Sequence, residues 1–227
     1  MATDFAIERG KLQLDANYTE PMFALWRETD QLFQRLFVGL SKYGLRLTDL
    51  KWDQGANSVG DVQLNFYLFN FAVGVRIRID RLEVELFDTR KVTADQLEEA
   101  VLDLATALRT HKPDMAFSAY SVAIAYHGML ADTTAMAYTA QLANAPKPLG
   151  APTGGTGAVF YYGPEDGRIS SAITADLSGV VADALFFRAL VVWDGAQVPL
   201  NEVKARMNAY MNRVFEGFGL NIPAPQL

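Results

Sequence analysis

The spacing of hydrophobic residues changes several times along the chain, and each change marks a predicted element. Alternation of apolar and polar residues over 5–16 predicts a first strand. Apolar residues at three- and four-residue steps over 22–40 predict a long amphipathic helix. Pro21 suits the first turn of this helix, because an amide at that position has no helical partner to lose. The Gly- and Asn-rich segment 52–61 then predicts a loop.

A three-stranded meander is predicted next, over residues 62–87, because apolar and polar residues alternate there in three short runs. Antiparallel sheets allow one buried and one polar face. The polar face carries Arg76 and Arg78 on one strand and Glu83 and Glu85 on the next, so we expect these charges to pair across strands.

A second helix is predicted after the meander. Thr93 and Gln96 have the spacing of a capping box, and Pro113 breaks the pattern at the other end. Glu98 and Glu99 are neighbours on this helix, so their side chains point to different faces and do not form a carboxylate pair.

The order of elements then repeats. Residues 117–127 predict a strand, Asp132 is the expected cap of an Ala-rich helix, and segment 145–157, rich in Pro and Gly, predicts a loop. Three further alternating runs lie within 158–193, and a closing amphipathic helix is predicted over 199–218.

Each half therefore reads strand, helix, three strands, helix. The expected fold class is α+β, with two pseudo-repeated β-α-β-β-β-α halves, 1–112 and 113–227, that form one curved antiparallel sheet with four helices on one face. Joining the halves edge to edge removes two exposed strand edges, so we expect one fused structural domain.

Composition and charge narrow the function classes. The chain is 50% hydrophobic and 20% charged, which is typical of a globular protein. Its formal net charge of −6 argues against broad binding to nucleic-acid phosphates. The most apolar segment, 179–193, contains Asp183 and Arg188 and is too short to span a membrane. Because the first residues also lack a secretory-signal pattern, we expect a cytoplasmic protein with no nucleic-acid partner and no membrane insertion.

Few residues offer catalytic or metal-binding chemistry. The chain has no cysteine and two histidines, which excludes thiolate zinc sites, iron–sulfur sites and thiol nucleophiles. The Gly-rich segment 150–157 leads into a strand and lacks the Lys of a phosphate-binding loop. His127 is the best candidate for a general base, but no partner triad is evident. We therefore assign no catalytic residue, no metal and no cofactor, and favour a protein without catalytic activity.

The duplicated order of elements resembles the saddle of the TATA-box-binding protein and its helix-grip relatives. This resemblance implies a curved sheet with an open face. A DNA-binding saddle needs an apolar and basic face, whereas this one is expected to carry Asn65, Glu83, Glu85 and Asp176. DNA binding is therefore not expected.

The closing segment ALFFRALVVWDGAQVPLNEVKARMNAYMNRVFEGF, residues 184–218, resembles the final strand and helix of a sporadically distributed bacterial family of uncharacterised α+β proteins. The resemblance implies a bacterial cytoplasmic protein that acts alongside neighbouring gene products. It supplies no catalytic residues.

Aromatic residues occur on both faces of several predicted strands. A sheet that helices cover on one side needs apolar residues on that side only, so the second face carries more apolar surface than the helices account for. An apolar patch on an open sheet face marks a partner surface, and interfaces favour Tyr, Phe and Arg at their centres. Burial beneath the 145–157 loop is the alternative. The candidate binding residues are Tyr67, Phe69, Arg76, Arg78, Tyr161, Phe186 and Arg188.

Our leading hypothesis is a non-catalytic protein-interaction or assembly subunit of a bacterial cytoplasmic complex, homo- or hetero-oligomeric, that uses an open sheet face or edge. The alternative is a protein that binds a small apolar ligand between helix and sheet. Ser121 and His127, on a strand of small residues, would then line the pocket, and the 145–157 loop would act as its lid.

Overall fold

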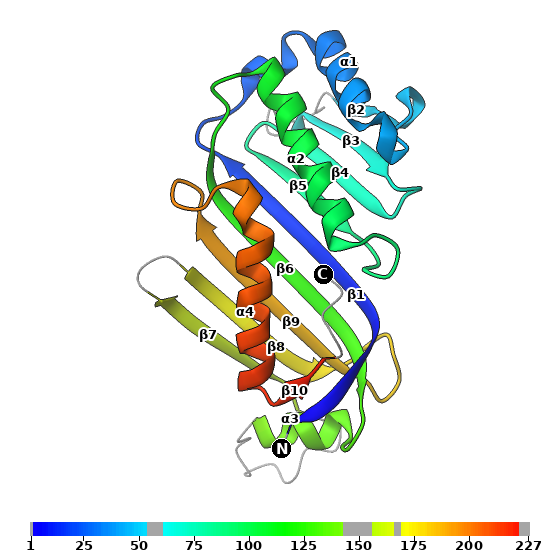
Figure 1. Ribbon diagram of the computed structural model, residues 1–227, viewed down its shortest axis with the longest axis vertical. Coiled ribbons are helices and arrows are strands. Elements are labelled where there is room, and N and C mark those ends of the chain that lie inside the picture. The colour runs from blue at the N-terminus through cyan, green and yellow to red at the C-terminus, as the bar shows by residue number, and fades with distance from the viewer. Residues whose placement is uncertain (1, 54–60, 143–155, 166–168, 223–227) are drawn as a thin grey trace.

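The computed structural model of the protein describes residues 2–53, 61–142, 156–165 and 169–222 (Figure 1). Its strands form one ten-stranded sheet in the order β2-β3-β4-β5-β1-β6-β9-β8-β7, and all neighbours along this path are antiparallel. The short β10 pairs with the start of β1 in the parallel sense. The strands are Thr3–Tyr18 (β1), Lys51–Asp53 (β2), Gln63–Leu68 (β3), Val73–Arg78 (β4), Arg81–Leu86 (β5), Phe117–Leu130 (β6), Ala158–Glu165 (β7), Ile169–Leu177 (β8), Leu185–Asp194 (β9) and Leu220–Asn221 (β10).

Four α-helices occur within the described ranges: Thr29–Leu40 (α1), Ala94–His111 (α2), Ala135–Leu142 (α3) and Val203–Gly217 (α4). Figure 1 shows α2 and α4 lying across the same face of the sheet, with α1 beside α2. Helix α3 lies at the end of the sheet near the N-terminus and contacts β8. The α+β class and the large antiparallel sheet are therefore confirmed. None of these helices is long and apolar enough to cross a membrane.

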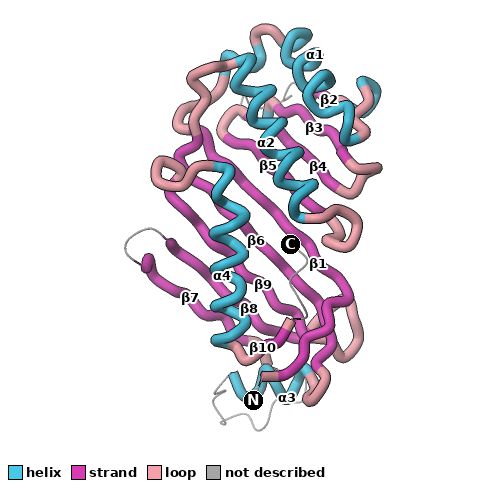
Figure 2. Tube along the Cα trace, in the orientation of Figure 1, coloured by secondary structure: helices cyan, strands magenta, loops and turns pink. Residues whose placement is uncertain are grey.

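Two long strands, β1 and β6, occupy the centre of the sheet and join its two sides (Figure 2). They pair from Phe5↔Leu130 to Tyr18↔Phe117, with irregularities between Ile7 and Arg9 and between Asn17 and Tyr18. Because neighbouring residues of a strand point to opposite faces, this register decides which side chains meet the helices.

The core fills the space between the sheet and the helices. In β6, Val122, Ile124 and Tyr126 are buried, whereas Ala123 and Ala125 between them are only partly buried and face the other side. The same alternation holds in β3, β4, β5 and β9, as the period-two pattern predicted.

The capping box at the start of α2 is confirmed. The Thr93 side chain accepts a hydrogen bond from the Gln96 amide, and the Gln96 side chain accepts one from the Thr93 amide. Each side chain thus satisfies a backbone amide that has no partner within the helix. The expected pairing of Arg76 with Glu83 is confirmed as well, at 2.7 Å.

The long helix predicted over 22–40 is wrong in its first half. A 3₁₀ turn, Phe23–Trp26, precedes α1, and Glu28 between them has an extended φ of −126°. The reason is tertiary. The Met22 amide donates to the carbonyl of Ile79, and Met22 and Leu25 are fully buried, so the chain follows the sheet before the helix begins.

The expected cap at Asp132 is also wrong. The Thr134 hydroxyl accepts the Ala137 amide at the start of α3, whereas the Asp132 amide donates to the Thr3 hydroxyl at the start of β1. Of the two predicted loops, residues 54–60 and 143–155 lie outside the described residues, and Lys51–Asp53 forms strand β2.

Candidate functional site

The sheet has one face covered by α2 and α4 and a second face, here called the open face, that no helix of the described residues covers (Figure 1). Registers across the strands place the residues of the open face in rows. One row runs Glu85, Gln13, Ala123, Leu190, Ala172 and Tyr161, from β5 to β7. The polar residues of this row lie at the β5 end and the apolar ones at the β7 end.

On the β1–β5 side, the open face carries acidic and basic side chains that form ion pairs with one another. Glu83 accepts Arg76 at 2.7 Å and Arg81 at 2.6 Å, and it lies 3.7 Å from Arg78. Lys11 pairs with Glu85 on the adjacent strand. The predicted binding residues Arg76 and Arg78 are therefore engaged within the protein, which leaves them less available to a partner.

Tyr67 lies on the open face, in an aromatic cluster with Phe71 and Phe87 at ring distances of 5.3 and 6.5 Å. Phe69, in contrast, does not lie on the open face. It follows β3 in a turn with a left-handed φ of 52°, and its ring packs on Tyr43 at 5.3 Å. The Tyr43 hydroxyl in turn donates to Asp103 of α2, so Phe69 lies on the helix side of the sheet. A period-two pattern could not reveal this, because the strand ends at Leu68 and the turn resets the alternation.

On the β6–β9 side, the open face carries a group of apolar residues, with Ser121, Ser170, Thr174 and Asp176 on the same face. Its floor consists of small residues and its margin of larger ones, and Tyr161 is 81% exposed, Val159 50% and Val192 38%. We call this surface the apolar patch. It comprises Ala123, Ala125, Val159, Tyr161, Ala172, Leu190 and Val192.

Arg188 stands within the apolar patch. Ala125 of β6 and Thr174 of β8 are its direct cross-strand neighbours, and Leu190 follows it on the same face. The side chain is partly buried, and within the described residues it makes neither an ion pair nor a hydrogen bond. A cation held on an apolar floor without a counter-charge is open to a carboxylate brought by another molecule.

His127 lies at the margin of the patch, opposite Arg9 and Phe186. Its Nδ1 atom is 2.8 Å from the Ser178 hydroxyl, and its ring packs against Phe186 in a tilted arrangement with ring centres 5.0 Å apart. The Ser178 oxygen already accepts the amides of Val180 and Val181. We therefore assign its proton to the bond with Nδ1, which leaves the histidine proton on Nε2.

This arrangement favours neutral His127. Burial, reinforced by the positive charge of Arg9, holds the pKa of the His127 imidazole below its ordinary value. Ser178 is occupied as a turn acceptor, so the pair is better suited to hold the 178–184 turn than to act as nucleophile and base.

A pH dependence of stability follows from His127. Because the pKa of His127 is lower in the folded state, the unfolded chain takes up the proton first as the pH falls. Neutral His127 therefore contributes to the free energy of unfolding fully above about pH 6.5, and this contribution is lost as the pH falls below that value. We expect His127→Gln to flatten the decline in urea midpoint between pH 7.5 and 5.5. An equally steep decline in His127→Gln and in the unaltered chain would contradict the assignment.

Ser121 and His127 do not line a pocket between helix and sheet, contrary to the expectation from the sequence. They alternate with the buried Tyr120, Val122 and Tyr126, so both point to the open face. The small residues of this strand therefore shape the open face and line no pocket on the helix side.

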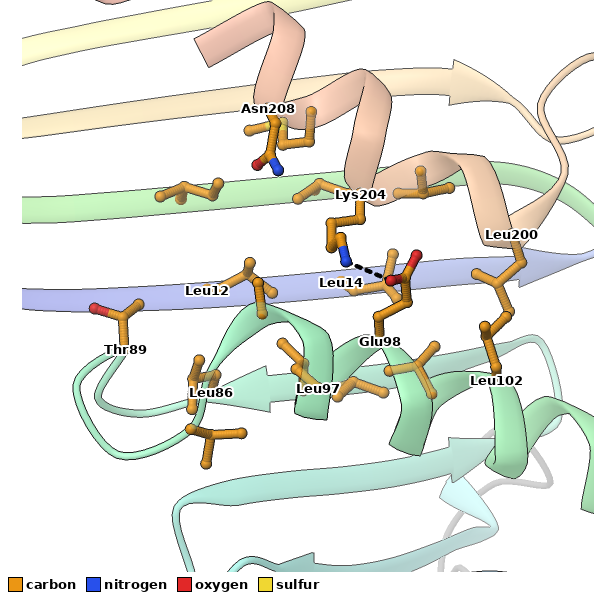
Figure 3. Close-up of a pocket in the computed structure, with 18 residues that line it drawn as sticks. Leu12, Leu14, Leu86, Thr89, Leu97, Glu98, Leu102, Leu200, Lys204 and Asn208 are labelled. Atoms are coloured by element: carbon orange, nitrogen blue, oxygen red, sulfur yellow. Dashed lines mark hydrogen bonds and ion pairs between the residues drawn. The ribbon is translucent and has the colours of Figure 1, made fainter. Parts of the chain in front are cut away.

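A cavity does exist on the helix side, between α2 and α4, but other residues line it (Figure 3). Its volume is about 80 Å³. The floor is formed by β1, β5 and β6, and the walls include Leu97 and Val101 from α2 and Val203 and Met207 from α4. The residues that line it are mostly aliphatic, so this cleft is apolar in character.

An ion pair bridges the cleft. Lys204 of α4 donates to Asp95 and Glu98 of α2, at 2.7 and 2.5 Å (Figure 3 shows the bond to Glu98). Glu99 instead pairs with Lys42 on the α1 side, which agrees with the opposite directions expected for Glu98 and Glu99. The link joins residues 106 positions apart, and nothing in the local pattern could have indicated it.

Within the described residues, no group of three His, Asp or Glu side chains converges as a metal site would require. Arg9, Ser178, Lys204 and Asn208 are residues of the candidate sites that the sequence analysis did not single out. Of these, only Arg9 carried a signal, since its alternation with Lys11 and Gln13 places it on the polar face of the first strand. Comparison of the chain with protein families, with curated proteins and with solved structures gives no match.

Proposed function

We propose that this protein is a non-catalytic interaction subunit that binds a partner protein on the open face of β6, β7, β8 and β9. The observation that carries the proposal is the apolar patch with Arg188, which has no ion pair among the described residues, in its last row beside Ala125 and Thr174. A soluble chain gains nothing from exposed Tyr and Val side chains on a sheet, whereas a partner that covers them gains roughly 25 cal/mol for each Å² of apolar surface buried.

The shape of the patch favours a close fit. Ala123 and Ala125 of β6 and Ala172 of β8 leave low surfaces on either side of β9, which carries Leu190 and Arg188, and Tyr161 and Val192 stand at the margin. Side chains of a partner could therefore reach the backbone level of the sheet. Fully desolvated anchors of this kind account for most of the binding energy of an interface.

Charge indicates the chemistry of the partner. Arg188 and Arg9 have no ion pair among the described residues, and both lie on the β1–β6–β9 part of the open face. The partner surface is therefore expected to present a carboxylate surrounded by apolar side chains. Nucleic acid fits this surface less well, since the same face carries Asp15, Asp176 and Glu85.

The proposal also covers the location, the assembly and the internal organisation of the protein. We infer a bacterial, cytoplasmic location and an assembly with the same or another chain. We also infer two related units, 1–112 and 113–227, because the sheet reads β1, β5, β4, β3 outward on one side and β6, β9, β8, β7 on the other. Helices α2 and α4 then occupy corresponding positions (Figure 1).

Site-specific photo-crosslinking in the native host tests the proposal. A benzophenone analogue of phenylalanine replaces Tyr161, and in the matched control it replaces Phe23, which is 55% exposed but lies in the turn before α1. We expect a crosslinked protein from position 161 and none of that mass from position 23. Light scattering of the purified chain shows whether the partner is a second copy.

The role of Arg188 is tested on the same complex. Arg188→Glu should weaken binding at least thirtyfold, because it sets two negative charges against each other in a desolvated interface, whereas Arg188→Lys should retain most of the affinity. Identical crosslinks from positions 161 and 23, or unchanged binding by Arg188→Glu, would contradict the proposal.

A further inference from the structure

The cleft between α2 and α4 contains a polar atom that the fold leaves unsatisfied. The Oδ1 atom of Asn208 is buried and has no hydrogen-bond partner among the described residues. Figure 3 shows this side chain projecting from α4 on the same side as Lys204, toward α2. Buried acceptors of this kind nearly always have a donor, because leaving one unpaired is costly.

The space beside Asn208 is large enough to hold more than solvent. A cavity of about 80 Å³ is several times what one water molecule requires, which is about 10–15 Å³. Its walls are aliphatic, with Leu12, Leu86 and Val101 among them. Water in such a cavity finds few polar partners, whereas an apolar chain or ring replaces it favourably.

The charges at the cleft argue against an anionic ligand. Lys204 is already neutralised by Asp95 and Glu98, so the cluster has a formal net charge of −1. A carboxylate entering the cleft would meet these acidic groups without a free cation. A neutral hydroxyl group, in contrast, can donate to Asn208 at no electrostatic cost.

We propose that the cleft between α2 and α4 binds a small neutral alcohol with an apolar chain of about three to four carbons, whose hydroxyl donates to Asn208 Oδ1. This site is separate from the apolar patch, because it lies on the opposite side of the sheet. Its occupancy does not depend on the partner proposed for the open face.

Two isomeric probes isolate the hydrogen bond. Butan-1-ol and 1-methoxypropane have the same formula and similar length, but only the alcohol has an O–H donor. We expect the full chain to bind butan-1-ol about tenfold more tightly, the difference that one hydrogen bond to a buried acceptor makes. Butanoate should bind more weakly than butan-1-ol. Titration followed by amide chemical shifts in NMR spectra measures all three.

Three variants locate the binding. Asn208→Leu should abolish the preference for the alcohol, whereas Asn212→Leu, one turn later on the exposed face of α4, should retain it. Val101→Phe should block both probes by filling the cavity, with circular dichroism confirming that it is folded. Equal binding of the two isomers to the unaltered chain, or persistent binding by folded Val101→Phe, would overturn the proposal.

Discussion

Phe187→Ala is expected to lower the free energy of unfolding by about 3–5 kcal/mol, the usual range for removing a buried phenylalanine ring. Phe187 is fully buried in β9, and its ring contacts Phe215 at 5.5 Å and Phe218 at 5.3 Å. These contacts attach the end of α4 to the sheet. Because α4 is also held by the buried Val203, Met207 and Met211 along its length, it cannot move inward to fill the space.

Urea unfolding followed by tryptophan fluorescence measures the loss in Phe187→Ala. Phe23→Ala is the matched control, since it removes the same atoms from a ring that is 55% exposed. Its effect should stay below about 1 kcal/mol, because surface substitutions rarely cost more. Similar losses in both variants would show that the aromatic contacts beneath α4 do not anchor the helix.

Gly128→Ala is expected to destabilise the protein by roughly 3 kcal/mol, the upper end of the usual overpacking cost. A Cβ atom at Gly128 would lie 2.5 Å from the Ala6 carbonyl oxygen and 2.7 Å from the Phe5 ring. The Ala6 contact is to backbone, which cannot rotate away as a side chain can. The strands β1 and β6 would therefore have to separate where they join the two sides of the sheet.

Gly163→Ala provides the control for this substitution. Gly163 lies in strand β7, and a Cβ atom there would have no neighbour within 4 Å. We expect little change in its urea midpoint, and the control also accounts for the effect of glycine on the unfolded chain. The close packing of β1 against β6 would be refuted by a Gly128→Ala variant as stable as Gly163→Ala.

The sequence by itself determined the elements and the faces of most strands. Period-two alternation identified the strands of the meander and separated the two faces of β6 without showing which of them meets the helices, and the Thr93–Gln96 spacing located the start of α2. These features are predictable because they depend on residues only a few positions apart, whose geometry the backbone determines directly. The pairing of Arg76 with Glu83 was predictable for the same reason, since a short turn sets the register.

Local patterns failed where a distant segment competed for the same residues. The helix predicted from Met22 begins only at Thr29, because the Met22 amide bonds to Ile79 in the sheet. Phe69 faces the helices although its strand suggested the open face. In both cases contacts between distant segments outweighed a local preference worth less than about 1 kcal/mol per residue.

Only the tertiary structure decided where the candidate sites lie. The pairing of β6 with β9 surrounds Arg188 with small residues, and the approach of α4 to α2 places Lys204 against Glu98 and Asn208 beside an apolar cavity. Periodicity shows that a side chain is buried or exposed, but it does not show which other element the side chain meets. That choice depends on the packing of the whole chain, because a helix face or strand edge can meet several partners and only the complete core selects one.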